Sequence, residues 1–261
     1  MALTNKTVKT TYKDILTIEN SNAGFDTNID QVKSGNGNLS ALYLSTNNIK
    51  IQPTADSTTN SVIYDKDGNI LFQVDSTNDA VKALGNHVNT QYVNFSITYE
   101  ANAGWVANTH YAVPFFGVIG KIATLNVDFG TGTDPDDSFT TANTDTQYAS
   151  QITAMMWRVP DAIVIDSVTH IEGADAATGD TTRMHLKSFD FTSGSTSCLS
   201  NGTLLAHNSD ITNSGNEQAY LSTWTVDSSS VAAGKVILCF FRCDSVNSDY
   251  SINVTVKYHL T

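Results

Sequence analysis

Glutamate and charge in general are scarce in this chain of 261 residues. Only 15% of the residues are charged, and four of those are glutamate. Long helices usually contain many more glutamates, whereas the strand-favouring residues Val, Ile, Thr, Tyr and Phe are common here. The shortage of helix formers therefore indicates an all-β protein whose strands are joined by turns rich in Ser, Thr, Asn and Asp.

Clusters of basic residues are missing as well. The 14 Lys and Arg residues are scattered, and the net charge is −12. Because nucleic-acid-binding proteins gather Lys and Arg on one face, we expect no nucleic-acid partner. The acidic residues are also spread through the turns, where they favour solubility and oppose non-specific adhesion.

Membrane segments, targeting segments and disulfides are not expected either. No apolar run reaches the length of about 18 residues that a membrane helix needs. Residues 1–18 are polar and predict no signal peptide, so we expect synthesis in a cytoplasm and no membrane partner. Cys239 and Cys243 would lie about 13 Å apart along one strand, which is too far for a disulfide. With one more cysteine in the chain, we expect all three to be reduced.

A near-repeat with a spacing of 21 residues organises the segment 40–73. Ser-Ala-Leu-Tyr at 40–43 recurs as Ser-Val-Ile-Tyr at 61–64, and Asn-Ile-Lys-Ile-Gln at 48–52 recurs as Asn-Ile-Leu-Phe-Gln at 69–73. Each copy predicts a β-hairpin of two short strands joined by a polar turn. A hairpin cannot bury its apolar face alone, so each copy requires neighbouring copies or partner chains.

The repeat therefore predicts a place where identical chains meet. We expect a homotrimer whose interface contains the apolar residues of the two hairpins: Leu42, Ile49, Ile51, Ile63, Ile70 and Phe72. The alternative is that both hairpins pack on the remainder of their own chain.

Residues 1–90 form the first predicted domain, an extended N-terminal arm followed by a collar of β-hairpins that serves anchoring and trimerisation. The segment Asp65–Asn69 predicts a tight turn, because Gly68 accepts the positive φ that such a turn requires. It resembles the start of a calcium loop, but Ser76 stands where that loop needs an acidic ligand. Residues 79–84 predict one or two helical turns that end at Gly85.

Residues 91–261 form the second predicted domain, a jelly-roll-type β-sandwich. Eight strands separated by Gly, Asp and Ser turns are predicted at 92–99, 122–129, 151–159, 163–171, 183–191, 219–226, 236–242 and 250–260. The run Val236–Phe241 is apolar on both faces, which indicates a strand that is covered on both sides. One side faces the sandwich core, and we expect another subunit on the other.

Motifs for chemistry are weak. The six histidines form no His-x-His pair, although neighbouring strands could bring His170 and His185 together with Cys198 or Asp190. The acidic run 134–137 fits a solvated turn better than a weak calcium site. Neither a Gly-x-Ser-x-Gly elbow nor a phosphate-binding loop occurs. We therefore expect no enzyme, no metal and no cofactor, with a cupin-like metalloprotein or a glycan hydrolase as the enzyme alternative.

Two stretches resemble a known class of proteins. Residues 37–46, Gly-Asn-Leu-Ser-Ala-Leu-Tyr-Leu-Ser-Thr, resemble a segment near the N-terminus of many tailed-phage virion proteins, especially those of marine and cyanobacterial phages. Trp157-Arg158-Val159-Pro160 and the final strand 250–260 look like the trimeric jelly-roll domains of the same proteins. These proteins serve as capsid decoration or cement trimers, head fibres or tail fibres.

The resemblance implies a non-enzymatic virion structural protein. Tail fibres usually carry long shaft repeats, whereas this chain has two repeat copies, which favours a homotrimeric decoration or cement protein on the phage capsid. Its partners would be itself and the major capsid protein or another virion protein. The alternative is a tail or head fibre protein whose jelly-roll binds host-surface glycans, with Trp105 as a stacking residue.

Overall fold

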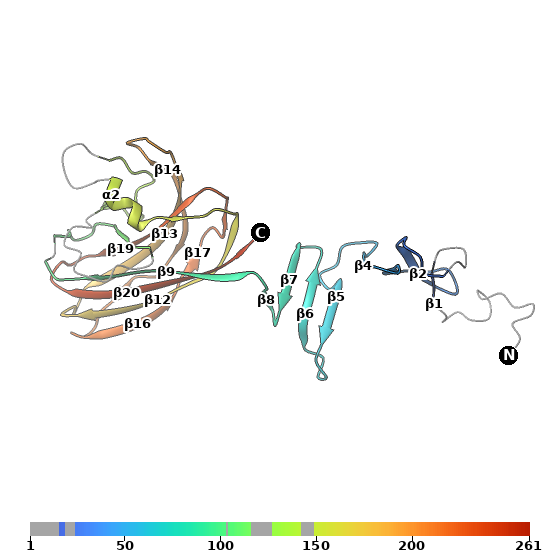
Figure 1. Cartoon of the computed structure of the whole chain (residues 1–261). Helices are drawn as coiled ribbons and strands as arrows, with labels where there is room; N and C mark the ends of the chain where they lie inside the picture. The colour runs from blue at the N-terminus through green and yellow to red at the C-terminus, as the bar shows by residue number, and fades with distance from the viewer. Residues whose placement is uncertain (1–15, 19–23, 103, 116–126, 142–148) are drawn as a thin grey trace, which may run out of the picture. The chain divides into compact units, whose positions relative to one another are not determined.

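The computed structural model describes residues 16–18, 24–102, 104–115, 127–141 and 149–261. The chain divides into two compact units, residues 1–88 (unit 1) and residues 89–261 (unit 2), two residues before the expected boundary. Both units consist of antiparallel sheets, shown in Figure 1, so the predicted all-β class is correct. The predicted N-terminal arm and most of the predicted strand 122–129 lie outside the described residues.

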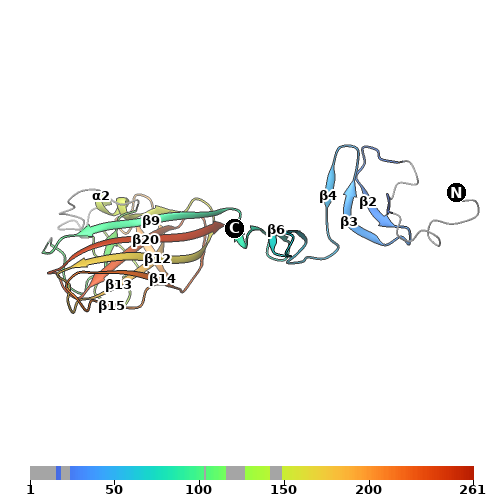
Figure 2. The ribbon, with the colours of Figure 1, turned by 90° about the horizontal axis from the view of Figure 1, so that it is seen from below.

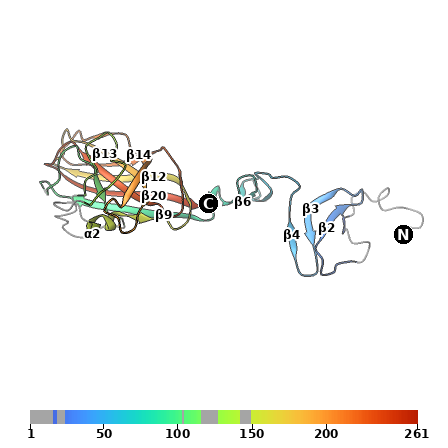
Figure 3. The same cartoon turned by 90° about the horizontal axis from the view of Figure 1, so that it is seen from above.

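Unit 1 contains two four-stranded meanders. The β1–β4 sheet consists of β1 (Leu16–Ile18), β2 (Asp30–Ser34), β3 (Leu39–Leu44) and β4 (Ile49–Ile51), and the β5–β8 sheet of β5 (Ser61–Tyr64), β6 (Ile70–Asp75), β7 (Ala80–Ala83) and β8 (Asn86–His87). The two predicted hairpins are β3–β4 and β5–β6. The two copies of the repeat therefore lie in different sheets. Figure 3 shows β2, β3 and β4 side by side.

The turns of the second meander show one correct and one wrong prediction. In the predicted tight turn, the backbone N–H of Asp65 donates to the carbonyl of Asn69 at 2.9 Å, and Gly68 has φ +85°. The helix predicted over 79–84 is wrong, because Ala80–Ala83 pairs with β6 as strand β7. The backbone pairing available beside β6 outweighs the weak local preference of so short a segment for a helix.

Unit 2 is a sandwich of two sheets. The β9 sheet has the order β16-β12-β20-β9, with β16 (Gln218–Thr223), β12 (Ile163–Asp175), β20 (Asp249–Leu260) and β9 (Thr90–Tyr99). The β19 sheet has the order β10-β19-β13-β14-β17, with β10 (Tyr111–Val113), β19 (Val236–Cys243), β13 (Thr181–Phe191), β14 (Leu199–His207) and β17 (Thr225–Val226). Short strands extend both sheets: β11 (Trp157–Arg158), β15 (Ile211–Thr212) and β18 (Ser230–Val231). Figure 2 shows β9, β20 and β12 side by side.

The strand pairing of unit 2 is that of a jelly roll. Among its eight main strands, the first pairs with the last, the second with the seventh, the third with the sixth and the fourth with the fifth. Such pairs form one long ribbon, and wrapping it around a core brings β20 beside β12 and β19 beside β13. The predicted jelly-roll-type sandwich is therefore correct.

Apolar residues cover both faces of the β19 sheet. Between the two sheets, Leu186 and Phe241 pack with Phe95 and Val254 of the β9 sheet. On the opposite face, Phe240 and its neighbours pack against Phe129, Phe139, Ile152 and Met155 of the same chain. The run 236–241 is thus covered on both sides as predicted. The expected subunit on its second side is wrong, because the chain covers that side itself.

Two segments form this cover. We call residues 127–141 the strap: Phe139 forms a bridge with Leu199, and the carbonyl of Asp137 accepts the N–H of Gly202 at 2.9 Å. The second segment is α2 (Ala149–Ile152) followed by the 3₁₀ turn Thr153–Met155. A strand was predicted over 151–159, but only Trp157–Arg158 is extended and paired, because a helical turn directs both Ile152 and Met155 into the core.

A substitution at Gly202 tests how closely the strap packs against β14. A Cβ atom at this position would lie 2.7 Å from Cα of Asp137 and 2.9 Å from Cε1 of Phe189. We expect Gly202→Ala to lower the free energy of unfolding of unit 2 by about 1–3 kcal/mol through overpacking. The matched control is Gly173→Ala, also within a strand, where the nearest atom is 4.0 Å away. Calorimetry should show a lower melting temperature for Gly202→Ala alone, and equal effects of both variants would contradict the packing described.

Candidate functional site

Unit 1 buries very little apolar surface. Among its described residues, Val32 and Ala80 are the only buried hydrophobic residues, and both hydrophobic clusters of the structure consist of unit 2 residues. Among the described residues, eighteen large hydrophobic side chains are exposed, and thirteen of them lie in residues 16–88. Small sheets need a covered apolar face to be stable in water, and no described residue of unit 1 covers these side chains.

The β1–β4 sheet is apolar on one face only. Residues opposite each other on paired strands share a face, and the pairs Leu42–Ile51, Leu44–Ile49 and Ile18–Val32 place these residues together. We call this set face A; its members are Leu16, Ile18, Val32, Leu42, Leu44, Ile49 and Ile51. Ile49 is 74% exposed and Ile51 56% exposed. Asp30, opposite Leu44, is a charged residue on the same face. The other face carries Gln31, Lys33 and Lys50 together with Leu39 and Tyr43, whose ring lies 4.7 Å below the Lys50 ammonium.

The β5–β8 sheet repeats this one-sided arrangement. The pairs Ile63–Phe72, Phe72–Ala83 and Val74–Val81 define its apolar face, which we call face B: Ile63, Phe72, Val74, Val81 and Ala83. Ile63 is 60% exposed. The opposite face carries Gln73, Asp75 and Lys82, whose ammonium lies 3.8 Å from the Asp75 carboxylate. The apolar residues of that face are Val62, Tyr64, Ile70 and Ala80. Two consecutive sheets therefore each present one mostly apolar face and one face on which polar and apolar residues are mixed.

Five of the six predicted interface residues fall on these faces. Leu42, Ile49 and Ile51 belong to face A, and Ile63 and Phe72 belong to face B. Ile70 does not, because a bulge shifts the register between Ile63 and Tyr64 and pairs Ile70 with Tyr64.

The interface prediction missed other members of the same faces. They are Leu16, Ile18, Val32, Leu44, Val74, Val81 and Ala83. The alternation of apolar and polar residues in Phe72-Gln73-Val74-Asp75 of strand β6 was the available signal for Val74.

The net charge is divided unevenly between the units. Residues 1–88 contain seven Lys and nine acidic residues, a net charge of −2, whereas residues 89–261 carry the remaining −10. Copies of unit 1 can therefore approach each other with little electrostatic repulsion, and copies of unit 2 repel each other unless they meet through uncharged surface.

Trp105, the predicted glycan-stacking residue, lies in the core of unit 2. Its ring is 5% exposed and stacks on Tyr99 with the centroids 5.2 Å apart. Phe241 and Tyr250 also contact it. The prediction is wrong, because the surrounding aromatic rings cover the indole and a sugar cannot stack on it.

The histidines that the sequence singled out do not come together. His170 lies inside the sandwich, where its Nδ1 accepts the indole N–H of Trp224 at 2.6 Å. Since an indole only donates, the proton of a neutral His170 is on Nε2, which lies 3.7 Å from Oε2 of Glu172. Thr182 donates its hydroxyl to the same buried carboxyl group. This cluster connects β12, β13 and the segment after β16, and serves packing.

His185 points to the other face of the β19 sheet, under the strap. Its ring lies 4.9 Å from that of His110, and its Nε2 lies 3.3 Å from a carboxylate oxygen of Asp134. Lys187, on the same face, donates to the carboxylate of Asp137 and to the carbonyl of Pro135. Lys187 therefore pairs with a carboxylate of the acidic run 134–137 and holds the strap on the sheet, a role the sequence did not reveal, whereas Asp134 lies beside the ring of His185.

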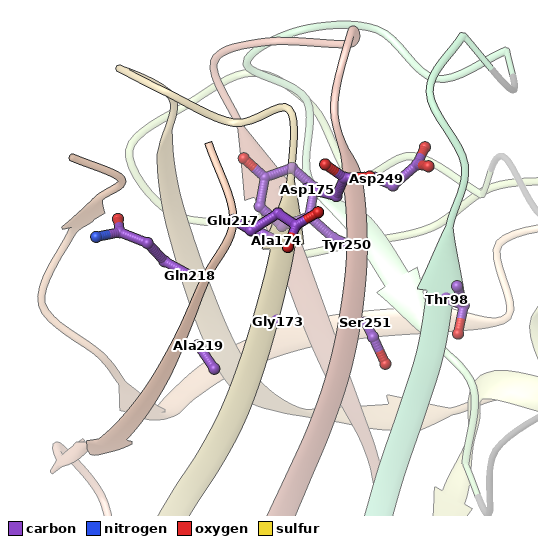
Figure 4. Close-up of a pocket in the computed structure, with 10 residues that line it drawn as sticks. All are labelled: Thr98, Gly173, Ala174, Asp175, Glu217, Gln218, Ala219, Asp249, Tyr250 and Ser251. Carbon is purple, nitrogen blue, oxygen red and sulfur yellow. The ribbon is translucent and has the colours of Figure 1, made fainter. Parts of the chain in front are cut away.

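A shallow hollow lies on the outer face of the β9 sheet. Its volume is about 510 Å³. Figure 4 shows Ala219, Gly173, Ser251 and Thr98 in a row across four strands. Three carboxylates, those of Asp175, Glu217 and Asp249, lie along one side of this row, near the ends of the strands. Asp249 accepts the N–H of Ala101. The hollow exists because this row consists of small side chains.

Known site types are not evident. In the described part of the chain, no group of three or more His, Cys, Asp or Glu side chains is arranged to bind a metal ion. The helical segments that the structure describes are too short and too polar to cross a membrane. The sequence matches no protein-family profile and no curated protein.

The buried pair of histidines makes the stability of unit 2 depend on pH. Burial lowers the pKa of His110 to about 4 and that of His185 to about 2, and nearby cationic groups add to the effect on His185. In the unfolded chain both titrate near their ordinary value of about 6.5. Between these values the unfolded chain binds protons that the folded chain does not. Stability is therefore complete above about pH 6.5 and falls as the pH decreases below it.

We expect calorimetry between pH 8 and 4.5 to show this loss, at up to about 1.4 kcal/mol per pH unit for each histidine. The variant His110→Gln with His185→Gln should give a flatter curve. A wild-type melting temperature that stays constant or rises on acidification would contradict the burial of the two neutral rings.

Proposed function

We propose that this chain is a non-enzymatic structural protein that forms a homotrimer through unit 1 and decorates the surface of a bacteriophage capsid. One observation carries the proposal: two successive sheets, the β1–β4 and β5–β8 sheets, each expose one mostly apolar face that no described residue of unit 1 covers. A partner must be present whenever these sheets are folded. Copies of the same chain meet this requirement most directly, since they are made together with it.

The distribution of polar residues supports self-association. The faces opposite A and B carry polar residues, including Lys50 in the first sheet and Gln73 in the second. Covering only the apolar faces leaves these residues in water. Three one-sided sheets can surround a common axis with their apolar faces inward, which agrees with the trimer implied by the resemblance of residues 157–160 and 250–260 to trimeric jelly-roll domains.

A trimer is well suited to bind a capsid. Three connected copies engage several capsid subunits at once, so the assembly dissociates much more slowly than one copy would. The near-neutral unit 1 would mediate assembly and attachment, and the acidic unit 2 would be presented to solvent. Burial of Trp105 removes the residue on which the glycan-binding alternative rested.

The interface can be tested with neighbouring residues on opposite faces of one strand. Ile49→Asp with Ile51→Asp places two charges in face A, so we expect light scattering to show a shift from three chain masses to one at micromolar concentration. Lys50→Asp, which lies between them on the polar face, should leave the trimer intact. A wild-type chain that is a folded monomer at this concentration would overturn the proposal.

Attachment to the capsid is tested separately. Purified full-length chain should co-sediment with phage heads that lack it and should raise their melting temperature, whereas the Ile49→Asp, Ile51→Asp variant should bind at least tenfold more weakly because multivalent contact is lost. Equal binding by the trimer and the monomeric variant would argue against capsid attachment through the trimer.

A further inference from the structure

The outer face of the β9 sheet is uncharged over a large area. The register of β16, β12, β20 and β9 places twelve outward residues in three rows of four, none of them charged. The rows are Ala219, Gly173, Ser251, Thr98; then Leu221, Ile171, Asn253, Ser96; then Thr223, Thr169, Thr255, Asn94. Such a face is unusual in a unit whose net charge is −10.

An apolar projection stands in the second row. Leu221 is 77% exposed, and Ile171, directly opposite it on β12, is 58% exposed. Single exposed hydrophobic residues are common on protein surfaces, but these two are cross-strand neighbours and form one patch. We call this pair the knob.

The hollow lies in the adjacent first row. Gly173 has no side chain there, and Ala219, Ser251 and Thr98 are small, which leaves the volume of about 510 Å³. Rows on one face of a strand are about 7 Å apart. The knob and the hollow are thus neighbours on the same surface, and the hollow is large enough for a leucine side chain.

We propose that the knob of one copy of this chain packs into the hollow of a second copy, so that the β9 sheet is a second surface of self-contact. A projection and a recess side by side on one face make a reciprocal contact, because the knob of each copy can enter the hollow of the other across a two-fold axis. The inference rests on the proposed function in one respect. Unit 1 ends at Val88 and unit 2 begins at Asn89, so no linker separates them. Association through unit 1 therefore keeps the copies of unit 2 at high local concentration.

The charge of unit 2 favours a second copy as the occupant. Most contacts between two units that each carry −10 are repulsive, so copies held close together meet best through uncharged surface. The twelve-residue face provides such a surface. The carboxylates of Asp175, Glu217 and Asp249 border the hollow, so the contact should strengthen as salt screens them.

Cysteine cross-linking of the full-length chain tests this contact. The test variant carries Leu221→Cys in the knob and Ser251→Cys in the hollow. These positions lie two strands and one row apart, about 12 Å, which is too far for a disulfide within one chain. The native Cys198, Cys239 and Cys243 are buried and do not interfere. The control variant replaces the knob cysteine with Phe191→Cys, an exposed apolar position on the β19 sheet.

After mild oxidation, we expect the test variant to form disulfide-linked oligomers at least tenfold more abundantly than the control, and more in 0.5 M than in 0.05 M salt. A trimer without this excess would overturn the inference and leave the proposed function standing. Binding of a sugar or a cation in the hollow would have the same two consequences. If light scattering shows a monomer, the proposed function fails. Cross-linking between such monomers would still support the contact, and its absence would overturn the inference as well.

Discussion

The structure depends on one constraint: a β-sheet with an apolar face is stable in water only when something covers that face. Unit 2 satisfies the constraint within its own chain. The two sheets cover each other, and the strap and α2 cover the second face of the β19 sheet. Unit 1 has two sheets of the same one-sided kind, but its described residues supply no such cover. The difference between the units, rather than any catalytic arrangement, points to assembly.

The two units also differ in how they would tolerate neighbours. The near-neutral unit 1 exposes apolar side chains in ordered sets on one face of each sheet, which is typical of an interface. The acidic unit 2 has a complete core and a surface that resists most contacts, apart from the uncharged face of the β9 sheet. A jelly roll alone does not indicate a function, since viral capsid proteins, lectins and cupins all use it. The argument for assembly therefore comes from the faces of unit 1.

Much of the fold could be predicted from local pattern. The strands 250–260 and 92–99 alternate between apolar and polar residues, and Asp65–Asn69 has a turn sequence, so short-range rules identified them. The wrong predictions concern residues whose conformation depends on distant partners. Residues 80–83 form a strand because β6 lies beside them, and Ile152 and Met155 lie in a helical segment that covers the β19 sheet.

The candidate site also has parts that local sequence predicts and parts that depend on distant residues. Faces A and B could be predicted in part, since alternation places Ile49 and Ile51 on one side of a strand. The contacts of the strap could not, because His185 and Asp134 are 51 positions apart and nothing local relates them. Trp105 was predicted to stack on a glycan, and nothing local shows that Tyr99 and Phe241 enclose its ring.

The central claim is that unit 1 is folded only while other copies cover faces A and B. Hydrogen exchange of the full-length chain over a range of concentrations tests this claim directly. The account predicts that the amides of β3, β4 and β6 are protected in the trimer and lose protection on dilution, in step with dissociation, while those of β19 and β20 stay protected. Persistent protection of β3, β4 and β6 in a dilute monomer would contradict it.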